Sequence, residues 1–349
     1  MLAYRIVEAQ KPGVLQDVPR PSPKPGEVLV KVASAGACHS DLHVMDWPLD
    51  MLRASQLNPP FTLGHECTGW VAELGPGPSY GLKEGDAVAV YGAWGCGYCR
   101  NCRLGAETHC DNAAKLGSMG GGLGRDGAMA EYELVPAARL LLPLGKLDPA
   151  TAAPLTDAAL TPYHAIRRAL PLLVPGSHAV VIGVGGLGHM AVQLLKALSP
   201  ALVVAVDTAP DKLELARQVG ADEPLLSSPK TAQQIRDLTH GLGAELVLDF
   251  VGADDTLQLA SQCARPLGQV TIIGLAGGHL SYGFGTLPFD AQLTLPYWGT
   301  VVELMEVLSL AETKRISLHV ERFSLRDAAK AYERLRAGQI RGRAVINPG

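Results

Sequence analysis

Hydrophobic positions in the second half of the chain fall into two alternating patterns. Short apolar runs predict buried parallel strands, and they lie at 178–183, 202–207, 223–227, 245–250 and 269–274. Apolar residues at helical spacing predict helices between them, at about 187–198, 210–219, 231–240 and 255–265. We expect 292–298 to add an edge strand. Strands that alternate with helices predict an α/β fold with a doubly wound parallel sheet.

The first half of the chain has a different pattern, in which short strands dominate. Alternating faces predict a strand over 27–34, and further strands are expected at 70–75, 85–90 and 128–135. Residues 44–63 show little periodicity and are expected to form a loop. Helices are predicted to begin at Asp148-Pro149 and at Asp157, with the second reaching Leu170. The tail predicts helices near 300–312 and 325–337 and a last strand over 343–346. A parallel sheet between β-rich ends suggests a nucleotide domain inserted into a second domain.

Composition restricts the classes of partner. A chain of 349 residues is long enough for about two domains. The net charge of −4 and the lack of a basic block argue against nucleic acid as a partner. No apolar run is long enough to span a membrane, and the N-terminus lacks a signal-peptide pattern. We therefore expect a cytoplasmic protein with no membrane partner.

A glycine motif follows the first of the predicted parallel strands. Gly183, Gly185 and Gly188 form G-x-G-x-x-G between a strand and a helix, which is the context that makes this motif informative. The first glycine permits a tight turn, the second lets the backbone approach a pyrophosphate, and the third lets helix and strand pack closely. The helix N-terminus then offers free N–H groups to phosphates. The residues expected to bind the cofactor here are Gly183, Gly185, Gly186, Leu187 and Gly188.

An acidic residue ends the next predicted strand. Asp207 lies 19 residues after Gly188, where a carboxylate can accept hydrogen bonds from the ribose of NAD and repels the 2′-phosphate of NADP. The first basic residue after it is Lys212, which we include among the cofactor-binding residues. A glycine-rich turn beside a solvent-facing Asp is the alternative. Because strand, turn, helix, second strand and acid agree, the sequence favours NAD binding.

Four of the seven cysteines lie close together in the sequence. Cys96, Cys99, Cys102 and Cys110 have the spacing C-x2-C-x2-C-x7-C, which suits a closed, tetrahedral, structural zinc site. An iron–sulfur cluster is the less favoured alternative, because no second cluster or Cys-Pro follows. In a reducing cytosol such cysteines are metal ligands or buried thiols rather than disulfides.

Two polar segments interrupt the strands of the first half. Five of the six residues from Cys38 to His43 carry groups useful in chemistry, and Gly64-His65-Glu66 precedes a strand. If the first segment is extended, Asp41 and His43 share a face. Asp157 lies among apolar residues and is either a helix cap or a buried ligand; the residues alone favour the cap.

These motifs together resemble the zinc-dependent medium-chain alcohol dehydrogenases over essentially the whole chain. The resemblance rests on Cys38 to His43, Gly64-His65-Glu66, the four cysteines, the glycine motif and Gly342-Arg343-Ala-Val. Asp157 and Tyr297-Trp298-Gly299 are most similar to the bacterial NAD-dependent secondary alcohol dehydrogenases. The family's fold implies a GroES-like catalytic domain over 1–157 and 296–349, and a Rossmann NAD-binding domain over 158–295.

The resemblance also implies a site and a mechanism. A catalytic zinc would be held by Cys38, His65 and Asp157, which leaves one position for water or substrate. Glu66 would lie near the zinc, and Asp41 would orient His65. Ser40 would accept the alcohol proton, and a relay through the cofactor ribose would pass it to His43 while a hydride moves to the nicotinamide.

His39 and Arg343 would neutralise the cofactor pyrophosphate, with a solvated surface histidine as the alternative for His39. The expected cofactors are therefore NAD and two zinc ions per chain, one catalytic and one structural. The expected substrate is a small alcohol, ketone or aldehyde, most consistent with a secondary alcohol. A homodimer or homotetramer is expected from the family.

Two other interpretations remain. A polyol or threonine dehydrogenase of the same family would need more polar pocket residues than the apolar candidates Trp47, Leu57, Leu123, Phe284, Tyr297 and Trp298. A non-enzymatic NAD-binding protein could share the fold. The joint presence of the zinc ligands, Ser40 and His43 argues against the latter.

Overall fold

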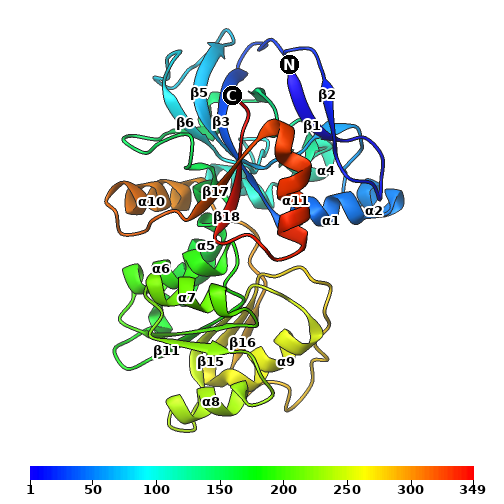
Figure 1. Ribbon diagram of the computed structural model, residues 1–349. Helices are drawn as coiled ribbons and strands as arrows, with labels where there is room; N and C mark the ends of the chain where they lie inside the picture. Colours follow the sequence, from blue (N-terminus) through cyan, green and yellow to red (C-terminus); the bar gives the residue numbers. More distant parts are fainter. The chain divides into compact units, whose positions relative to one another are not determined.

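The computed structural model describes residues 1–349, and they divide into two compact units (Figure 1). Unit 1 comprises Met1–Leu160, Gly299–Thr313 and Leu318–Gly349. Unit 2 comprises Thr161–Trp298 and Lys314–Ser317. None of the helices combines the length and the apolar character needed to cross a bilayer.

Unit 1 is built on a seven-stranded, largely antiparallel sheet. Its order is β10-β6-β5-β3-β18-β17, and β9 also pairs with β3. The strands are β3 (Val28–Ala37), β5 (Glu66–Leu74), β6 (Ala87–Val90), β9 (Tyr132–Val135), β10 (Leu141–Pro143), β17 (Val320–Ser324) and β18 (Arg343–Asn347). In the register of β18 against β3, Ala344 lies opposite Ala37 and Ile346 opposite Ala35. The last strand of the chain therefore lies beside the strand that leads to Cys38.

Smaller elements complete unit 1. A three-stranded sheet contains β1 (Leu2–Ile6), β2 (Val14–Asp17) and β4 (Phe61–Thr62), and a two-stranded one contains β7 (Gly120–Gly121) and β8 (Gly124–Arg125). The helices are α1 (His39–Asp46), α2 (Leu49–Ala54), α3 (Arg100–Arg103), α4 (Ala113–Leu116), α10 (Val301–Glu312) and α11 (Ala328–Arg336). Short 3-10 turns are η1 (Glu107–His109), η2 (Ala138–Leu140), η3 (Ala153–Thr156) and η5 (Leu325–Asp327).

Unit 2 is a six-stranded, wholly parallel sheet of order β13-β12-β11-β14-β15-β16. The strands are β11 (His178–Ile182), β12 (Leu202–Asp207), β13 (Glu223–Leu226), β14 (Ala244–Asp249), β15 (Ala264–Ile272) and β16 (Gln292–Thr294). Its helices are α5 (Leu160–Ala169), which begins at the boundary with unit 1, η4 (Leu170–Leu172), α6 (Gly188–Leu198), α7 (Pro210–Gln218), α8 (Thr231–Leu238) and α9 (Asp254–Cys263). Figure 1 shows α6 and α7 on one face of the sheet and α8 and α9 on the other. The predicted doubly wound sheet is confirmed.

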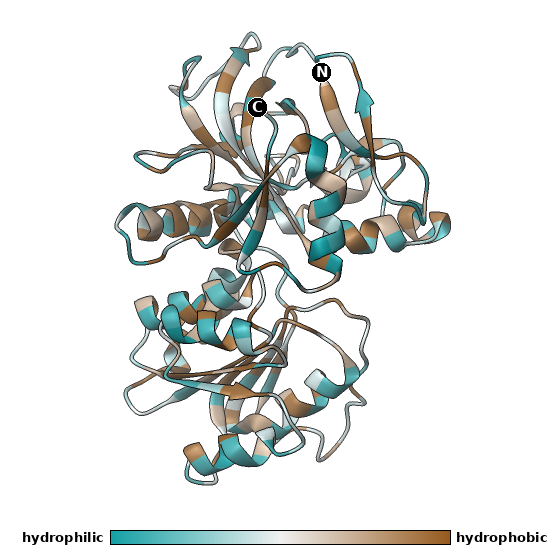
Figure 2. Ribbon diagram, in the orientation of Figure 1, coloured by the Kyte–Doolittle hydropathy of each residue, from teal (hydrophilic) through white to brown (hydrophobic).

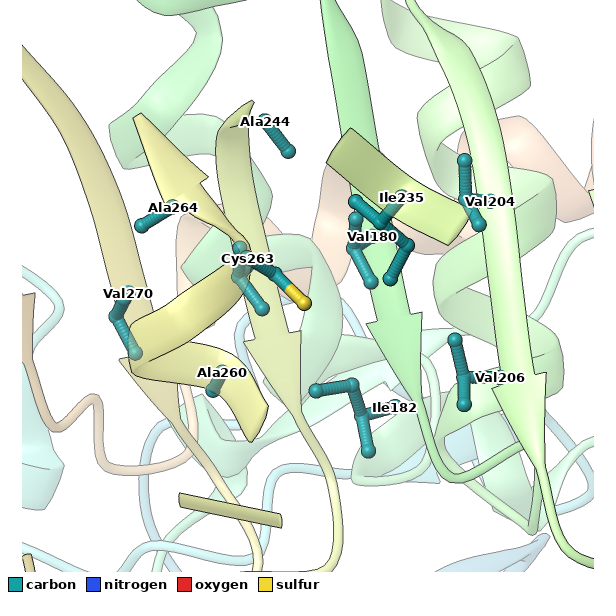
Figure 3. Packing of buried hydrophobic residues seen from close by; sticks show 11 residues of the cluster. Val180, Ile182, Val204, Val206, Ile235, Ala244, Ala260, Cys263, Ala264 and Val270 are labelled. Atoms are coloured by element: carbon teal, nitrogen blue, oxygen red, sulfur yellow. The ribbon is translucent and has the colours of Figure 1, made fainter. Parts of the chain in front are cut away.

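The hydrophobic core of unit 2 explains why its strands and helices could be predicted from the spacing of apolar residues. Ile235 of α8 and Ala260 and Cys263 of α9 pack together with Val180 and Ile182 of the central strand β11 (Figure 3). Each fully buried Val or Ile side chain contributes roughly 1.5–3 kcal/mol to folding. Figure 2 shows hydrophobic strands in this sheet and a mainly hydrophilic α7, as expected where helices separate a sheet from solvent.

Two predictions of local structure in the N-terminal half of the chain were wrong. The segment after β3 is not extended: α1 begins at His39, and α2 occupies part of the expected loop over 44–63. The cause is local, because the Cys38 N–H donates to Asp41 Oδ2 at 2.9 Å and closes the first turn of α1. In a helix, residues two apart point to different sides, so Asp41 and His43 do not share a face.

The helix predicted to begin at Asp148 was also wrong. Ala150 N–H does donate to Asp148 Oδ1 at 2.9 Å, but only turns and η3 follow. Pro154 has no N–H to continue a helical ladder, which limits this segment to turns. The next helix, α5, begins at Leu160 and not at Asp157.

Candidate functional site

Cys38, His65 and Asp157 converge in unit 1 from three separate segments. Cys38 follows β3, His65 precedes β5, and Asp157 follows η3. Cys38 and His65 are buried and Asp157 is largely buried, and their ligand atoms lie within 4.8 Å of one another. Asp157 Oδ2 is 3.7 Å from Cys38 Sγ and 3.6 Å from His65 Nε2. Because α5 begins only at Leu160, Asp157 is not the N-cap that the residues alone favoured.

The three donors fit a zinc ion in both spacing and chemistry. Tetrahedral ligands bound about 2.0–2.3 Å from zinc lie roughly 3.3–3.8 Å apart, which matches the two distances to Asp157. Thiol, imidazole and carboxylate are the ligand types that zinc takes in proteins. Burial alone lowers the pKa of His65, but Asp41, Asp157 and Cys38 outweigh it and raise that pKa well above 6.5. The surroundings thus favour positive charge at this position.

Two of the predicted polar residues of α1, Ser40 and Asp41, flank the imidazole of His65. Asp41 Oδ1 is 3.2 Å from His65 Nδ1, within ion-pair distance. Ser40 Oγ is 3.3 Å from His65 Nε2, on the ring edge that faces Asp157. Ser40 and Asp41 therefore contact opposite nitrogens of the same imidazole.

Glu66 and Arg343 form a buried pair beside the cluster. The Arg343 Nη2 donates to Glu66 Oε1 at 2.6 Å and Nε donates to Oε2 at 3.1 Å, and Ala158 N–H donates to Oε1 at 3.0 Å. A β-carbon at Gly36 would collide with the Glu66 carboxylate, so only glycine fits there. Burial raises the pKa of Glu66, although Arg343 opposes this. Arg343 also lies 3.6 Å from Asp157, and its contact with a pyrophosphate stays a prediction.

The two histidines of α1 lie outside this buried group. His39 is exposed at the first residue of the helix, and His43 is half-buried one turn later. Burial is the main cause that lowers the pKa of His43, while Asp46 raises it and Arg336 lowers it further. A neutral His43 can accept a proton at neutral pH.

The four cysteines predicted as a metal lobe come together in unit 1. Their sulfur atoms lie within 4.8 Å of one another, with 3.9 Å between Cys96 and Cys102. Several N–H groups point at the sulfurs: Cys99 N and the Asn112 side chain donate to Cys96, and Cys96 N and Asn112 N donate to Cys110. Burial is the largest single influence and raises the pKa of Cys96, but the hydrogen bonds it accepts from the Tyr98 backbone, the Asn112 side chain and Cys99 N together lower that pKa to about 6. Donors of this kind stabilise thiolates, which are the form that binds zinc.

The glycine motif of unit 2 has the geometry expected of each glycine. Gly183 has a φ of +85°, Gly185 has open space where a β-carbon would lie, and a β-carbon on Gly188 would collide with the Gly183 carbonyl oxygen. Gly186 and Leu187 complete the turn before α6. Asp207 is tied to this turn, because its carboxylate accepts hydrogen bonds from Val184 N at 2.7 Å and Ala209 N at 2.9 Å.

Lys212 and Tyr332 show the limits of the sequence analysis. Lys212 is largely buried in the first turn of α7, and its contact with a cofactor stays a prediction. Tyr332 was not among the residues predicted from the sequence, and its hydroxyl donates to Asp41 Oδ2 at 2.8 Å. No local signal could identify it, because 291 positions separate the two residues.

Comparison with known proteins agrees with this geometry. The family model for the alcohol dehydrogenase GroES-like domain matches residues 24–146. The family model for the zinc-binding dehydrogenase matches residues 186–302. An NAD-dependent alcohol dehydrogenase of Sulfurisphaera tokodaii is 37% identical over the whole of both chains.

Solved structures agree as well. An alcohol dehydrogenase of Aeropyrum pernix is similar with a TM-score of 0.92, 34% identity and full coverage of both chains. An acetophenone reductase of Geotrichum candidum, solved with NAD, has a TM-score of 0.86 and 32% identity, over 99% of this chain and 96% of that one. The predicted GroES-like and Rossmann folds are confirmed. The chain therefore belongs to the zinc-dependent medium-chain alcohol dehydrogenase family.

Proposed function

We propose that this protein is an NAD-dependent alcohol dehydrogenase that interconverts secondary alcohols and ketones. The observation that carries the proposal is the buried convergence of Cys38, His65 and Asp157 beside Ser40, with the spacing of zinc ligands. These three residues would hold the catalytic zinc. Zinc at such a site supplies a Lewis acid that makes an alcohol oxygen easier to deprotonate.

The residues around the cluster have separate roles. The hydroxyl of Ser40 is 3.3 Å from Nε2 of His65, the nitrogen that lies nearer Asp157, so it is placed to accept the alcohol proton. His43 follows Ser40 by three positions on α1 and so lies on a neighbouring part of the helix surface. We assign it the next step of proton transfer toward solvent. Glu66, held by Arg343, keeps a buried carboxylate next to the ligands.

Unit 2 would bind the cofactor. The N–H groups at the start of α6 and the open backbone at Gly185 favour a pyrophosphate, and Asp207 favours the ribose of NAD. Gly183, Gly186, Leu187, Gly188 and Lys212 would complete this site.

The four-cysteine cluster would hold a structural zinc. A thiol-only set with sulfurs about 3.8 Å apart fits tetrahedral zinc, and the observed Cys96–Cys102 distance is 3.9 Å. Metal analysis distinguishes the alternatives, because an iron–sulfur cluster would give iron and acid-labile sulfide in place of the second zinc.

The choice of substrate is tested directly. We expect NADH to form with 2-alkanols and 1-phenylethanol at higher kcat/KM than with sorbitol or threonine, and a chelator that removes the catalytic zinc should stop the reaction. Higher kcat/KM with sorbitol or threonine would favour the polyol or threonine dehydrogenase. NAD binding without turnover of any of these substrates would favour the non-enzymatic alternative.

We also propose a homodimer or homotetramer in the cytoplasm. Exposed apolar side chains gather in one segment of unit 2, where Phe284 is 98% exposed and Leu275, Tyr282, Phe289 and Leu295 are also exposed. Such side chains are commonly covered by a partner. All seven cysteines are free thiols, which suits a reducing compartment. Light scattering of the purified protein tests the subunit number.

A further inference from the structure

Asp41 is the meeting point of three contacts in the buried part of unit 1. It is 1% exposed. Its Oδ2 accepts hydrogen bonds from the Cys38 N–H at 2.9 Å and from the Tyr332 hydroxyl at 2.8 Å. Its Oδ1 faces His65 Nδ1 at 3.2 Å. With Oδ2 held by two donors, the carboxylate is fixed in the rotation that presents Oδ1 to the histidine.

Tyr332 is itself held firmly. It is 3% exposed on α11, and its ring stacks on that of Tyr4, with 5.7 Å between the ring centres and 17° between the planes. Burial, together with the charge of Asp41, keeps the pKa of Tyr332 well above 10. Its hydroxyl therefore remains a donor over the whole range in which such an enzyme works. A second contact also joins the two helices, because Arg336 of α11 binds the Asp46 carboxylate of α1 at 2.7 and 2.8 Å.

We propose that Tyr332 is a positioning residue for the zinc ligand His65, which it orients through Asp41. A carboxylate at Nδ1 keeps the proton on that nitrogen and leaves Nε2 free for the metal. Nε2 is the nitrogen that lies 3.6 Å from Asp157. The proposal rests on the function proposed above, namely that Cys38, His65 and Asp157 hold the catalytic zinc. It adds a residue from the C-terminal helix to the support of that site.

The test is the release of zinc from the holoenzyme to a chromophoric chelator. The wild-type protein should release two zinc ions per chain in two kinetic phases, assigned by a Cys38→Ser variant that lacks the catalytic ion. Replacing a residue that supports a metal ligand typically costs 10–100-fold in metal affinity. Because Tyr332 acts one contact further out, Tyr332→Phe should release the catalytic zinc about ten-fold faster. The zinc of the four-cysteine cluster should leave at the wild-type rate.

Matched variants separate positioning from general loosening of unit 1. Tyr4→Phe removes a hydroxyl from the stacked partner and leaves the Tyr332–Asp41 bond in place, so it should change neither phase. Asp41→Asn should speed catalytic zinc release, and adding Tyr332→Phe to it should have little further effect, because both act through one contact. The visible spectrum of cobalt bound at the catalytic site should shift in Tyr332→Phe and stay unchanged in Tyr4→Phe. This spectrum reports on ligand geometry even if the stability of the variant is reduced.

Other results would contradict either the positioning role of Tyr332 or the proposed metal site. Equal acceleration of both phases, an unchanged catalytic phase in Tyr332→Phe, or full additivity with Asp41→Asn would overturn the positioning role. A wild-type protein that holds one zinc per chain, at the four cysteines only, would instead overturn the proposed catalytic metal site and the role of Tyr332 with it.

Discussion

Glu133 should make the stability of unit 1 depend on pH in the opposite direction from an ordinary salt-bridged carboxylate. It is 2% exposed on β9, next to Cys67 and Gly121, and its Oε2 has no hydrogen-bond partner within the protein. Burial raises the pKa of Glu133 from 4.5 to about 8, while the contact with Cys67 and the charge of His65 lower it only in part. The folded protein therefore holds this proton up to about pH 8, whereas the unfolded chain releases it near pH 4.5.

The sign and size of the effect follow from proton linkage. Between the two pKa values unfolding releases one proton, so stability falls as pH rises, by at most about 1.4 kcal/mol per pH unit. From pH 5 to pH 7, ionisation of Glu133 should lower the free energy of unfolding by about 2.5 kcal/mol. Glu133→Gln replaces the carboxyl by a neutral group of the same shape. The stability advantage of the variant over the wild type should widen by about 2.5 kcal/mol between pH 5 and pH 7.

The assay is urea unfolding of zinc-loaded protein, followed by tryptophan fluorescence from pH 5 to pH 8. Three of the four tryptophans, Trp47, Trp70 and Trp94, lie in unit 1 and report on the unit that contains Glu133. Glu84→Gln, which neutralises an exposed carboxylate, is the matched control and should leave the pH dependence unchanged. Parallel stability curves for the wild type and Glu133→Gln would refute the reasoning, as would a gap that narrows toward pH 7.

Three further predictions concern the cofactor, the metals and the proton path. Asp207→Gly should lower the KM for NADP and narrow the preference for NAD, measured by initial rates with both cofactors; equal use of both by the unaltered protein would contradict this role of Asp207. Cys99→Ser should lower stability because structural zinc contributes to folding, whereas Cys38→Ser should abolish turnover with the circular dichroism spectrum retained. His43→Gln should keep zinc and slow alcohol oxidation roughly ten-fold near neutral pH, with the loss shrinking at high pH and partly reversed by imidazole; an unchanged pH–rate profile, with a deuterium isotope effect showing that chemistry limits the rate, would remove His43 from the path.

The part of the fold that the sequence predicted best is the part held by local patterns. The strand predicted at 202–207 is β12, and the helices predicted at about 187–198 and 210–219 differ from α6 and α7 by a residue or so. Strands buried on both faces need continuous apolar runs, and the glycine turn needs its three glycines, so both leave a signal within a short window.

The segment after β3 was mispredicted because polar side chains hid a helix. In α1 the buried residues Leu42, Val44 and Met45 do not repeat often enough in eight residues to reveal helical spacing. The signal that was available is Cys38-x-x-Asp41, which has the spacing of a capping box with cysteine in place of serine.

The position of Asp157 was also not predictable from local residues. These residues alone favoured a helix cap, and only the family resemblance grouped Asp157 with Cys38 and His65.

The contacts that the sequence could not predict are those between the two ends of the chain. Arg343 reaches Glu66 across 277 positions, and Tyr332 reaches Asp41 across 291. No pattern of spacing encodes such pairs, because they exist only once β18 has aligned with β3 and α11 has packed beside α1.

These long-range contacts also explain why the chain must return to unit 1 after building unit 2. The group around His65 contains three buried carboxyl groups, those of Asp41, Glu66 and Asp157, and burying charge without compensation is costly. Residues of the N-terminal part of the chain offset them with the backbone N–H of Cys38, the Cys38 thiol and His65. The guanidinium of Arg343 and the hydroxyl of Tyr332 both come from the last 30 residues of the chain, and each is bound to one of these carboxyl groups. A divalent cation bound by Cys38, His65 and Asp157 would supply positive charge at the third carboxyl group, that of Asp157. On this argument, loss of the C-terminal strand should weaken the metal site before any residue that touches the metal is changed.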